Sequence, residues 1–315
     1  MTSILITGST GFLGAYLIPL LSNNNLHLIV RSKEKAPDWL KQFTLLEGDI
    51  TKPNLGLREI PDIDEIWNLA GVINLSKKAH KENFKVNAEG AYEVTQFALK
   101  HKLKRIVHIS TAYASDEYRN PYEQSKWIGE CYIREITSIS TIIFRPSILI
   151  GESATGIMPK DVEIGAFYRF IARLAKMHRR IESLRKKAES KLRLPPLEPT
   201  FRLKGNPDGK LNLIPIDIAA EAMVKIAQEK EQGIFNITNP NPPTLQQLAD
   251  WVGEAIKLNL SFNPNAYLSP IELAFASVMK DFLPYLQGDN LPSDIELPFN
   301  VDKEFIQKTV SSLIK

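Results

Sequence analysis

Cysteine is the residue that this sequence has least of. Cys131 is the only one among 315 residues, which excludes an internal disulfide and is typical of a protein kept in a reducing compartment. We interpret it as a small core residue, because a lone nucleophile would need a histidine partner that the sequence alone cannot place. We therefore expect a cytoplasmic protein.

Long hydrophobic runs are also missing. The chain has no uninterrupted apolar stretch of the roughly eighteen residues that a membrane-spanning helix needs, so we expect no transmembrane segment. The first apolar stretch, residues 4–21, has no Lys or Arg before it and is interrupted by glycine, serine and threonine, so we expect that it is not an export signal.

A strong local excess of positive charge is found in one segment of the sequence. The net charge is +3, and 43% hydrophobic with 24% charged residues is ordinary for a globular protein of one large or two smaller domains. Residues 176–193 hold eight Lys and Arg against two Glu, so that segment carries +6 and the rest of the chain −3. Because no interleaved aromatic residues accompany the basic segment, we expect no nucleic-acid partner.

The first half of the chain alternates short apolar runs with helical patterns. This alternation predicts an α/β fold, a doubly wound parallel sheet wrapped by helices. The predicted strands are residues 3–7, 26–30, 43–46, 64–69, 104–110 and 140–145, and the predicted helices are 12–22, 80–101 and 122–137.

The second half has a different pattern. From Ile164 to Leu192 apolar residues recur every three or four positions, which predicts a long amphipathic helix or helix pair that Pro195 and Pro196 end. "LNLIPI" and "GIFNIT" predict strands flanking a helix at 217–230, a return to the sheet, and Thr244 is expected to cap the helix "LQQLADWVGEAI". We therefore expect a sheet domain, residues 1–152 and 209–238, and a smaller, mainly helical lobe, 153–208 and 239–315, over the carboxyl ends of the strands.

Three glycines at intervals of three, in "ITGSTGFLG", lie between the first predicted strand and helix. This context is typical of a Rossmann dinucleotide site, because the start of the helix offers unpaired N–H groups to a pyrophosphate. We expect Gly8 to make the tight turn, Gly11 to let the backbone approach the phosphates, and Gly14 to let the helix pack closely on the sheet. The same loop places Ser9, Thr10, Phe12 and Leu13 among the expected cofactor-binding residues.

The end of the second predicted strand indicates which nucleotide is bound. Arg31 and Ser32 stand there in place of the acidic residue that usually binds the ribose of NAD, which favours NADP, with NAD as the alternative. Arg31 could instead be an ordinary solvated side chain. Asp49, after the third strand, is a candidate adenine contact or a simple turn carboxylate.

A second group of residues has the chemistry of a proton donor. In "NPYEQSKW", Tyr122 and Lys126 are four apart at a helix start and share one face, so a lysine cation could lower the pKa of the phenol. Such a pair also occurs by chance on helix surfaces. Ser110 and Thr111, at the end of the fifth strand, could both hydrogen-bond the same substrate oxygen.

Together these residues resemble the extended short-chain dehydrogenase/reductase family. The resemblance rests on "TGSTGFLG", "GDI", "NLAG", "VNAEGA", "STAY", the Tyr122/Lys126 pair and "RPSILIG". It implies that Tyr122 donates the proton, Lys126 binds the nicotinamide ribose and lowers the Tyr122 pKa, Thr111 polarises the carbonyl with Ser110 as the competing choice, and Asn87 supports the proton relay. It also implies cofactor contacts from Asn87, Tyr122, Lys126, Ile50, Leu69, Ala70, Gly71, Arg145, Pro146, Ser147 and Ile148.

Within that family the sequence is most similar to the male-sterility branch of fatty acyl-CoA reductases and thioester reductase domains. "ISTAY", "NPYEQSKW" and "FRPSILIGESATG" look like blocks of that branch, and the match is weakest over 160–205 and after about residue 260. The resemblance implies NADPH-dependent reduction of an acyl thioester, or a related apolar carbonyl, to an aldehyde or alcohol.

The partners and the alternatives follow from the same resemblance. Coenzyme A and acyl carrier proteins are anionic and would be attracted to Lys176, Arg179, Arg180, Lys186 and Lys187, although a solvated lid helix would carry the same charges. A homodimer through the helices 80–101 and 122–137 is expected, and no metal site is predicted. An NAD-dependent sugar-nucleotide epimerase or dehydratase and a non-catalytic NADP-binding regulatory protein remain the alternatives.

Overall fold

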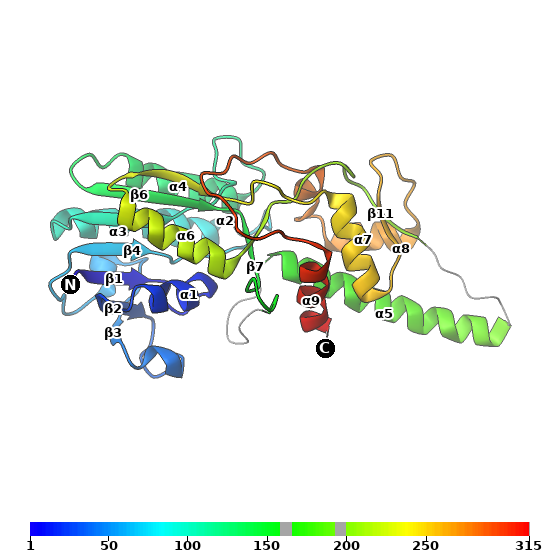
Figure 1. Cartoon of the computed structure of the whole chain (residues 1–315), viewed down its shortest axis with the longest axis horizontal. Helices are drawn as coiled ribbons and strands as arrows, with labels where there is room; N and C mark the ends of the chain where they lie inside the picture. The colour runs from blue at the N-terminus through cyan, green and yellow to red at the C-terminus, as the bar shows by residue number, and fades with distance from the viewer. Residues whose placement is uncertain (158–165, 193–199, 315) are drawn as a thin grey trace.

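A seven-stranded parallel sheet forms the first part of the molecule in a computed structural model, which describes residues 1–157, 166–192 and 200–314. The strand order is β3-β2-β1-β4-β5-β6-β10, so the chain starts in the middle and winds outward in both directions (Figure 1). The strands are β1 (Ser3–Thr7), β2 (Asn25–Val30), β3 (Thr44–Glu47), β4 (Glu65–Asn68), β5 (Arg105–Ile109), β6 (Ser140–Pro146) and β10 (Gly233–Ile237).

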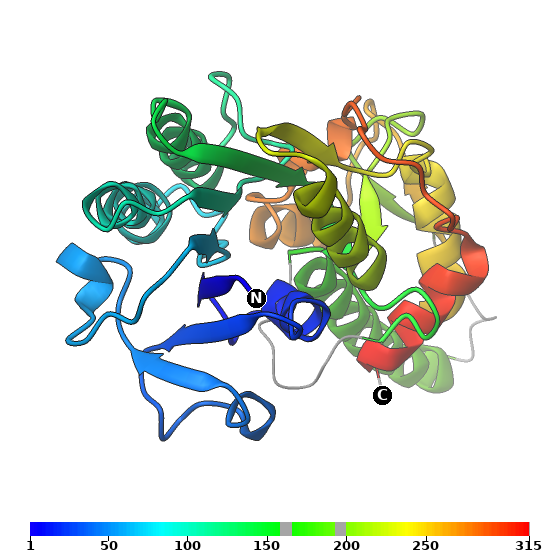
Figure 2. The same cartoon turned by 60° about the vertical axis from the view of Figure 1, so that its left-hand side comes forward.

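Helices cover both faces of this sheet, which explains why apolar residues point to both sides of its central strands. Ile4 and Ile6 face one core with α1 and α6, whereas Leu5, between them, faces the other core with α3. Figure 2 shows the sheet between α3 and α4 on one side and α1 and α6 on the other. The bounds are α1 (Phe12–Leu20), α3 (Gly90–Lys100), α4 (Pro121–Arg134) and α6 (Ile216–Glu229), with the short α2 (His80–Asn83) and a π-helical stretch, η3 (Phe84–Glu89), ahead of α3.

The remaining elements form a lobe around a separate hydrophobic core. The long helix α5 packs there with α7, which a capping box at Thr244 starts, and with a two-stranded sheet of β8 and β11. The bounds are β7 (Ile148–Ile150), α5 (Ala166–Leu192), β8 (Phe201–Leu203), β9 (Leu213–Pro215), α7 (Leu245–Ile256), β11 (Leu260–Phe262), α8 (Pro270–Val278) and α9 (Lys303–Ile314), with three short 3-10 turns η1 (Asp38–Leu40), η2 (Pro53–Gly56) and η4 (Leu283–Gln287).

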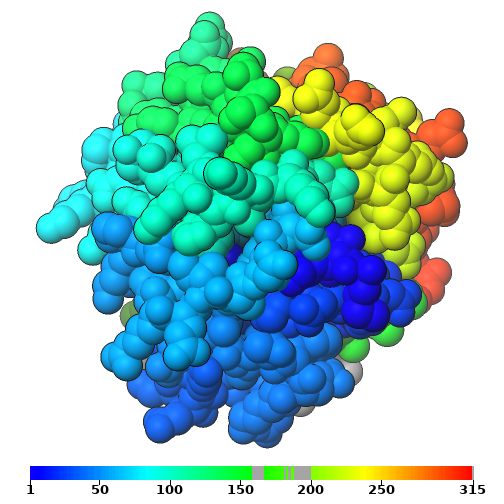
Figure 3. Space-filling model, turned by 90° about the vertical axis from the view of Figure 1, so that its left-hand side faces the viewer, coloured from blue at the N-terminus to red at the C-terminus, as the bar shows by residue number. Residues whose placement is uncertain are grey.

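The lobe lies at the carboxyl ends of the parallel strands. In Figure 1 the strands run from the end marked N toward the lobe. Figure 3 shows the opposite, amino end, where the first half of the chain, blue to green, fills most of the view. Ligands of open α/β sheets bind at the carboxyl ends, so this arrangement places the loops of the predicted site under the lobe.

The fold class and the six predicted strands are confirmed, with two differences in the elements. The predicted helix 80–101 contains the π-helical stretch η3, and the strand predicted in "LNLIPI" is only β9, which pairs with β7 outside the main sheet. Pro215 ends β9 and has no N–H for a further ladder bond. Ile164, Pro195 and Pro196 lie outside the described residues.

Two further observations concern the whole chain. None of the helices in the described ranges has the length and apolar character needed to cross a membrane. The division into domains at 152/153, 208/209 and 238/239 stays a prediction.

Candidate functional site

The glycine loop has the close backbone approaches that only glycine permits. Gly8 has φ +68°, and a Cβ there would lie 2.5 Å from the amide nitrogen of Ala70. A Cβ on Gly14 would lie 2.7 Å from the carbonyl oxygen of Ser9. Gly11 is the N-cap of α1 and supplies no side-chain cap, so the first N–H groups of the helix remain available to an anion. These residues fit a dinucleotide pyrophosphate.

Some residues in and around this loop hold it against the sheet, and others line a cavity. Ser9 is buried and donates a hydrogen bond to the carbonyl oxygen of Ile29 at 3.0 Å, so it fastens the loop to β2, whereas Thr10 is exposed. Leu69 and Gly71, which follow β4, line a cavity together with Phe12 and Leu13.

The predicted nucleotide-selecting residues lie after β2 and β3. Arg31 is exposed and Ser32 half-buried, directly beyond the end of β2. Oδ1 of Asp49 accepts hydrogen bonds from the Thr51 amide at 2.9 Å and the Thr51 hydroxyl at 2.8 Å. Burial opposes ionisation of Asp49, but these bonds keep its pKa below the usual value. Asp49 thus has the geometry of a turn carboxylate. Ile50 is buried and packs under the first residue of α3, where a Cβ on Gly90 would meet its side chain.

Tyr122 and Thr111 are brought together at the start of α4. The side chain of Asn120 caps the helix by accepting from the Glu123 amide at 3.0 Å, and Pro121 occupies its first turn. Tyr122 lines the cavity, and burial raises its pKa to about 12 although a hydrogen bond with Thr111 acts in the opposite direction.

Lys126 departs from the role that the spacing suggested. It lies one turn beyond Tyr122 and is buried, but its ammonium donates to the carbonyl oxygen of Ile109 at 2.5 Å. Burial lowers its pKa to about 8, and Lys126 is not among the groups that lower the pKa of Tyr122. In this structure burial therefore holds the pKa of Tyr122 above that of free tyrosine, and the expected lowering by Lys126 does not offset it.

Asn87 lies inside the π-helical stretch, an irregularity that often marks functional positions. Its side chain accepts from the Val72 amide at 2.9 Å and donates to the Val72 carbonyl oxygen and the Ser125 hydroxyl, both at 3.0 Å. A Cβ on Gly71 would lie 3.2 Å from Asn87 Oδ1 and 3.7 Å from Lys126 Nζ. Asn87 thus ties the loop after β4 to α4 beside Lys126.

The two candidate hydroxyls after β5 have different partners. Ser110 donates to Glu130 at 2.7 Å, and the same buried carboxylate holds the guanidinium of Arg145 at 2.5 and 3.0 Å. Ser110 and Arg145 thus share one buried carboxylate, although Ser110 also lines the cavity, whereas the Thr111 hydroxyl donates to the carbonyl oxygen of Pro146 at 3.5 Å. Sequence reasoning did not single out Glu130, although its position four residues after Lys126 places it on the same helix face.

One cavity of about 330 Å³ joins these parts. It begins at the glycine loop, passes Tyr122 and Thr111, and continues between α5 and α7 into the core of the lobe, with apolar side chains along most of its wall. Pro146, Ser147 and Ile148, which were expected to contact the cofactor, line it. The lobe residues in the wall were missed as ligand contacts, although the helical periodicity of 164–192 had placed Phe167, Ile171 and Leu174 on one apolar face. The lobe residues that line the cavity are Phe167, Phe170, Ile171, Leu174, Leu203, Leu211, Leu245, Leu248, Ala249, Val252, Leu260, Phe262, Phe282, Tyr285 and Leu286.

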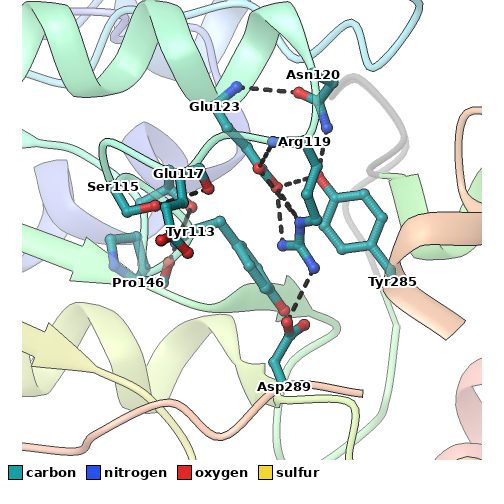
Figure 4. A network of polar contacts seen from close by, with 10 residues as sticks. Tyr113, Ser115, Glu117, Arg119, Asn120, Glu123, Pro146, Tyr285 and Asp289 are labelled. Atoms are coloured by element: carbon teal, nitrogen blue, oxygen red, sulfur yellow. Dashed lines mark hydrogen bonds and ion pairs between the residues drawn. The ribbon is translucent and has the colours of Figure 1, made fainter. Parts of the chain in front are cut away.

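A polar network closes the wall beside Tyr122. Arg119, just ahead of α4, pairs with Glu123 at 2.8 Å and with Asp289 at 2.9 Å. Tyr113 and Tyr285 flank the guanidinium and also line the cavity (Figure 4). Nothing in the sequence indicated this network, because its two halves are separated by more than 160 residues.

Comparison with known proteins finds similar sequences and folds. The model of the NAD dependent epimerase/dehydratase family matches residues 4–238. A mitochondrial NADH dehydrogenase 1 alpha subcomplex subunit 9 from Dictyostelium discoideum is 28% identical over 55% of this chain and 49% of its own length. The chain thus spans about half of that relative and far less of the larger synthetases that it matches.

Two further similarities involve reductases. A carboxylic acid reductase from Mycobacterium marinum is 23% identical over 80% of this chain and 26% of its own length. The solved thiolation-reductase di-domain of an archaeal non-ribosomal peptide synthetase superposes with a TM-score of 0.71 at 16% identity, over 99% of this chain and 75% of that one, which shows a shared fold.

Proposed function

Since the chain belongs to the NAD dependent epimerase/dehydratase family, we propose that it is an NADPH-dependent reductase of acyl thioesters or closely related apolar carbonyl compounds. Family membership and the reductase relatives support an NAD(P)-dependent oxidoreductase. The observation that carries the substrate class is the apolar cavity that runs from the glycine loop past Tyr122 into the lobe. An acyl chain gains free energy in such a cavity, whereas the hydroxyl groups of a sugar would lose their hydrogen bonds there.

The chain's own residues define the parts of the reaction. The start of α1 and the glycine loop would hold the pyrophosphate, and Leu69 and Gly71 would border the dinucleotide. A bound nicotinamide cofactor supplies the hydride. The hydroxyls of Tyr122 and Thr111 bind the carbonyl oxygen and stabilise the oxyanion that forms when the carbonyl carbon gains the hydride. Collapse of that oxyanion expels the thiolate and leaves an aldehyde.

Tyr122 has a second role in the reduction of an aldehyde to an alcohol. A phenol with a pKa of about 12 is protonated at neutral pH and can donate its proton to the alkoxide. Asn87 and Lys126 lie behind the tyrosine in positions from which they can keep the site oriented.

We also propose that the thioester arrives on coenzyme A or a carrier protein. The exposed cations in the described part of α5 include the five that the sequence singled out, and the helix extends beyond the rest of the lobe in Figure 1. Such a surface attracts phosphates and acidic proteins, and this attraction weakens with salt. The residues are Lys176, Arg179, Arg180, Lys186 and Lys187.

One observation favours the alternative function of a sugar-nucleotide epimerase, namely the match to the NAD dependent epimerase/dehydratase family. Against it stand the exposed Arg31, where an acidic residue would select NAD, and the apolar cavity wall.

Nicotinamide absorbance separates these functions. We expect NADPH oxidation with long-chain acyl-CoA and not with UDP-sugars, and we expect Tyr122→Phe to lower kcat at least a hundredfold while the Kd for NADPH stays within twofold. Tyr118→Phe, an exposed tyrosine ahead of α4, is the matched control and should keep full activity. Full turnover by Tyr122→Phe would exclude the proposed role of this residue.

A further inference from the structure

Arg119 lies beside the proposed catalytic centre and contacts two carboxylates and two aromatic rings. Its Nε and Nη2 donate to Glu123 Oε1 at 3.0 and 2.8 Å, and its backbone amide donates to the other oxygen of the same carboxylate at 2.8 Å. Its Nη1 donates to Asp289 at 2.9 Å. The guanidinium carbon lies 4.1 Å from the ring centre of Tyr285 and 4.9 Å from that of Tyr113, and Figure 4 shows it between these groups.

These contacts join the C-terminal part of the lobe to the first turn of α4. The Tyr285 hydroxyl donates to Glu123 Oε1 at 2.7 Å and accepts from Asn120 Nδ2 at 2.9 Å. Asn120 is the N-cap of α4, and Glu123 belongs to the same turn as Tyr122. The turn that carries Tyr122 is therefore fixed by a segment more than 160 residues away in the sequence.

Charge makes Arg119 indispensable to this arrangement. The Glu123 side chain is 1% exposed, and burial of a carboxylate is costly unless a cation pairs with it and hydrogen bonds satisfy its oxygens. Glu123 directly follows Tyr122, and its negative charge disfavours ionisation of the phenol. Asp289 is a second partly buried carboxylate in the network, so one guanidinium compensates two acids.

We propose that Arg119 is a positioning residue of the reductase, which holds Tyr122 at the cavity by clamping the first turn of α4 to the segment Tyr285–Asp289 and by neutralising Glu123. The inference rests on the proposed role of Tyr122 as hydroxyl donor to the substrate oxygen. It concerns geometry at the reacting centre, where displacement by about 1 Å can cost a hundredfold in rate.

The chain offers a matched control in Arg105. Its side chain is 25% exposed, as is that of Arg119, and it pairs at 2.6 Å with Glu65, whose side chain is 6% exposed. Arg105 and Glu65 begin β5 and β4, at the amino end of the sheet away from the cavity. Loss of either arginine leaves a buried carboxylate, but only the loss of Arg119 disturbs the turn that carries Tyr122.

The test compares Arg119→Gln and Arg105→Gln with palmitoyl-CoA and NADPH. We expect Arg119→Gln to lower kcat about a hundredfold with the Kd for NADPH within twofold, and to speed hydrogen exchange of the amides at 120–126. Arg105→Gln should lower the unfolding temperature similarly and keep kcat within threefold. Arg119→Lys retains the charge without the planar fork and should recover only part of kcat.

Two results would overturn the inference. One is an unchanged kcat in Arg119→Gln, and the other is an equal loss of kcat in both arginine variants at equal loss of stability. If Arg119→Gln does not fold, Tyr285→Phe takes its place: it removes the hydroxyl bonds to Glu123 and Asn120, should lower kcat at least fivefold, and contradicts the inference if kcat is unchanged. Full turnover by Tyr122→Phe would instead contradict the proposed function, so the two failures are distinguishable.

Discussion

At the scale of single residues, desolvation determines the chemistry of the site more than charge pairing does. The four-residue spacing correctly placed Tyr122 and Lys126 on one face of α4. It did not predict which group accepts the hydrogen bond of the Lys126 ammonium. Burial raises the pKa of Tyr122 to about 12 and lowers that of Lys126 to about 8. A sequence gives the spacing of such groups, whereas the backbone carbonyl of Ile109 that takes up the ammonium becomes a partner only once β5 and α4 are packed.

Arg31 yields a prediction at this scale. Its exposed guanidinium, just beyond β2, can bind the 2′-phosphate that distinguishes NADP from NAD. We expect NADPH to bind more tightly than NADH, and Arg31→Ala to remove most of the difference, measured as the two Kd values by cofactor fluorescence. Arg58→Ala, an exposed arginine in the loop before β4, should leave both values unchanged. Equal affinity of the unaltered protein for both nucleotides would contradict the assignment.

Other residues show where sequence reasoning ends. Ser110 and Thr111 are adjacent hydroxyl residues, so only their partners, the Glu130 carboxylate for one and the Pro146 carbonyl oxygen for the other, separate them. The Arg119 network was invisible for a related reason, since Arg119 and Glu123 lie in the first half of the chain whereas Tyr285 and Asp289 lie more than 160 residues further on.

At the scale of elements, the pattern of buried residues carried most of the information. Parallel strands covered on both faces are continuous apolar runs, so β1 to β6 were predictable to within a few residues. Thr244 was recognisable as a cap because threonine accepts a hydrogen bond from the third residue of a helix. The π-helical stretch around Asn87 and the pairing of β7 with β9 depend on contacts across the fold, which no local pattern records.

The joint between β8 and α8 gives a pH prediction. Burial disfavours the charge on Glu272, but hydrogen bonds from Arg202 and Ser269 lower its pKa to about 2 from an ordinary value of 4.5. The stabilisation is fully present above the unfolded pKa and is lost as the pH falls from about 4.5 toward 2. Glu272→Gln should therefore destabilise the protein at neutral pH and flatten the decline of the urea midpoint in this range.

The control for that measurement is Glu254→Gln. Glu254 pairs with Lys303 on the surface, where both side chains are about half exposed, so its removal should change little. An acid profile of Glu272→Gln that parallels the unaltered protein would contradict the assignment.

At the scale of the whole molecule, the lobe converts a dinucleotide fold into a site for one class of substrate. Its core and the cavity wall share residues of α5, α7, β8 and β11, so the same side chains stabilise the lobe and face the ligand. The sequence was least informative here, because the apolar pattern is the same for residues that contact one another in a core and for residues that line a substrate cavity. The predicted homodimer stays a prediction.

The cavity makes a prediction about chain length. Ala249 on α7 is a small residue in the wall, and Ala249→Phe should fill part of the space. We expect kcat/KM to fall about fourfold for each methylene that is displaced, so that the preferred acyl-CoA becomes shorter. Ala274→Phe, on the exposed face of α8, should keep the original profile, and an unchanged profile in both variants would place the acyl chain elsewhere.

The most direct test of the proposed function follows the hydride itself. The protein is incubated with palmitoyl-CoA and NADPH that carries deuterium at the transferring position of the nicotinamide ring, and the products are analysed by mass spectrometry. The account predicts palmitaldehyde, or the alcohol, with deuterium at C1, and no such product with Tyr122→Phe. The proposed function would be contradicted if the protein oxidised no NADPH with any acyl thioester and instead epimerised a UDP-sugar.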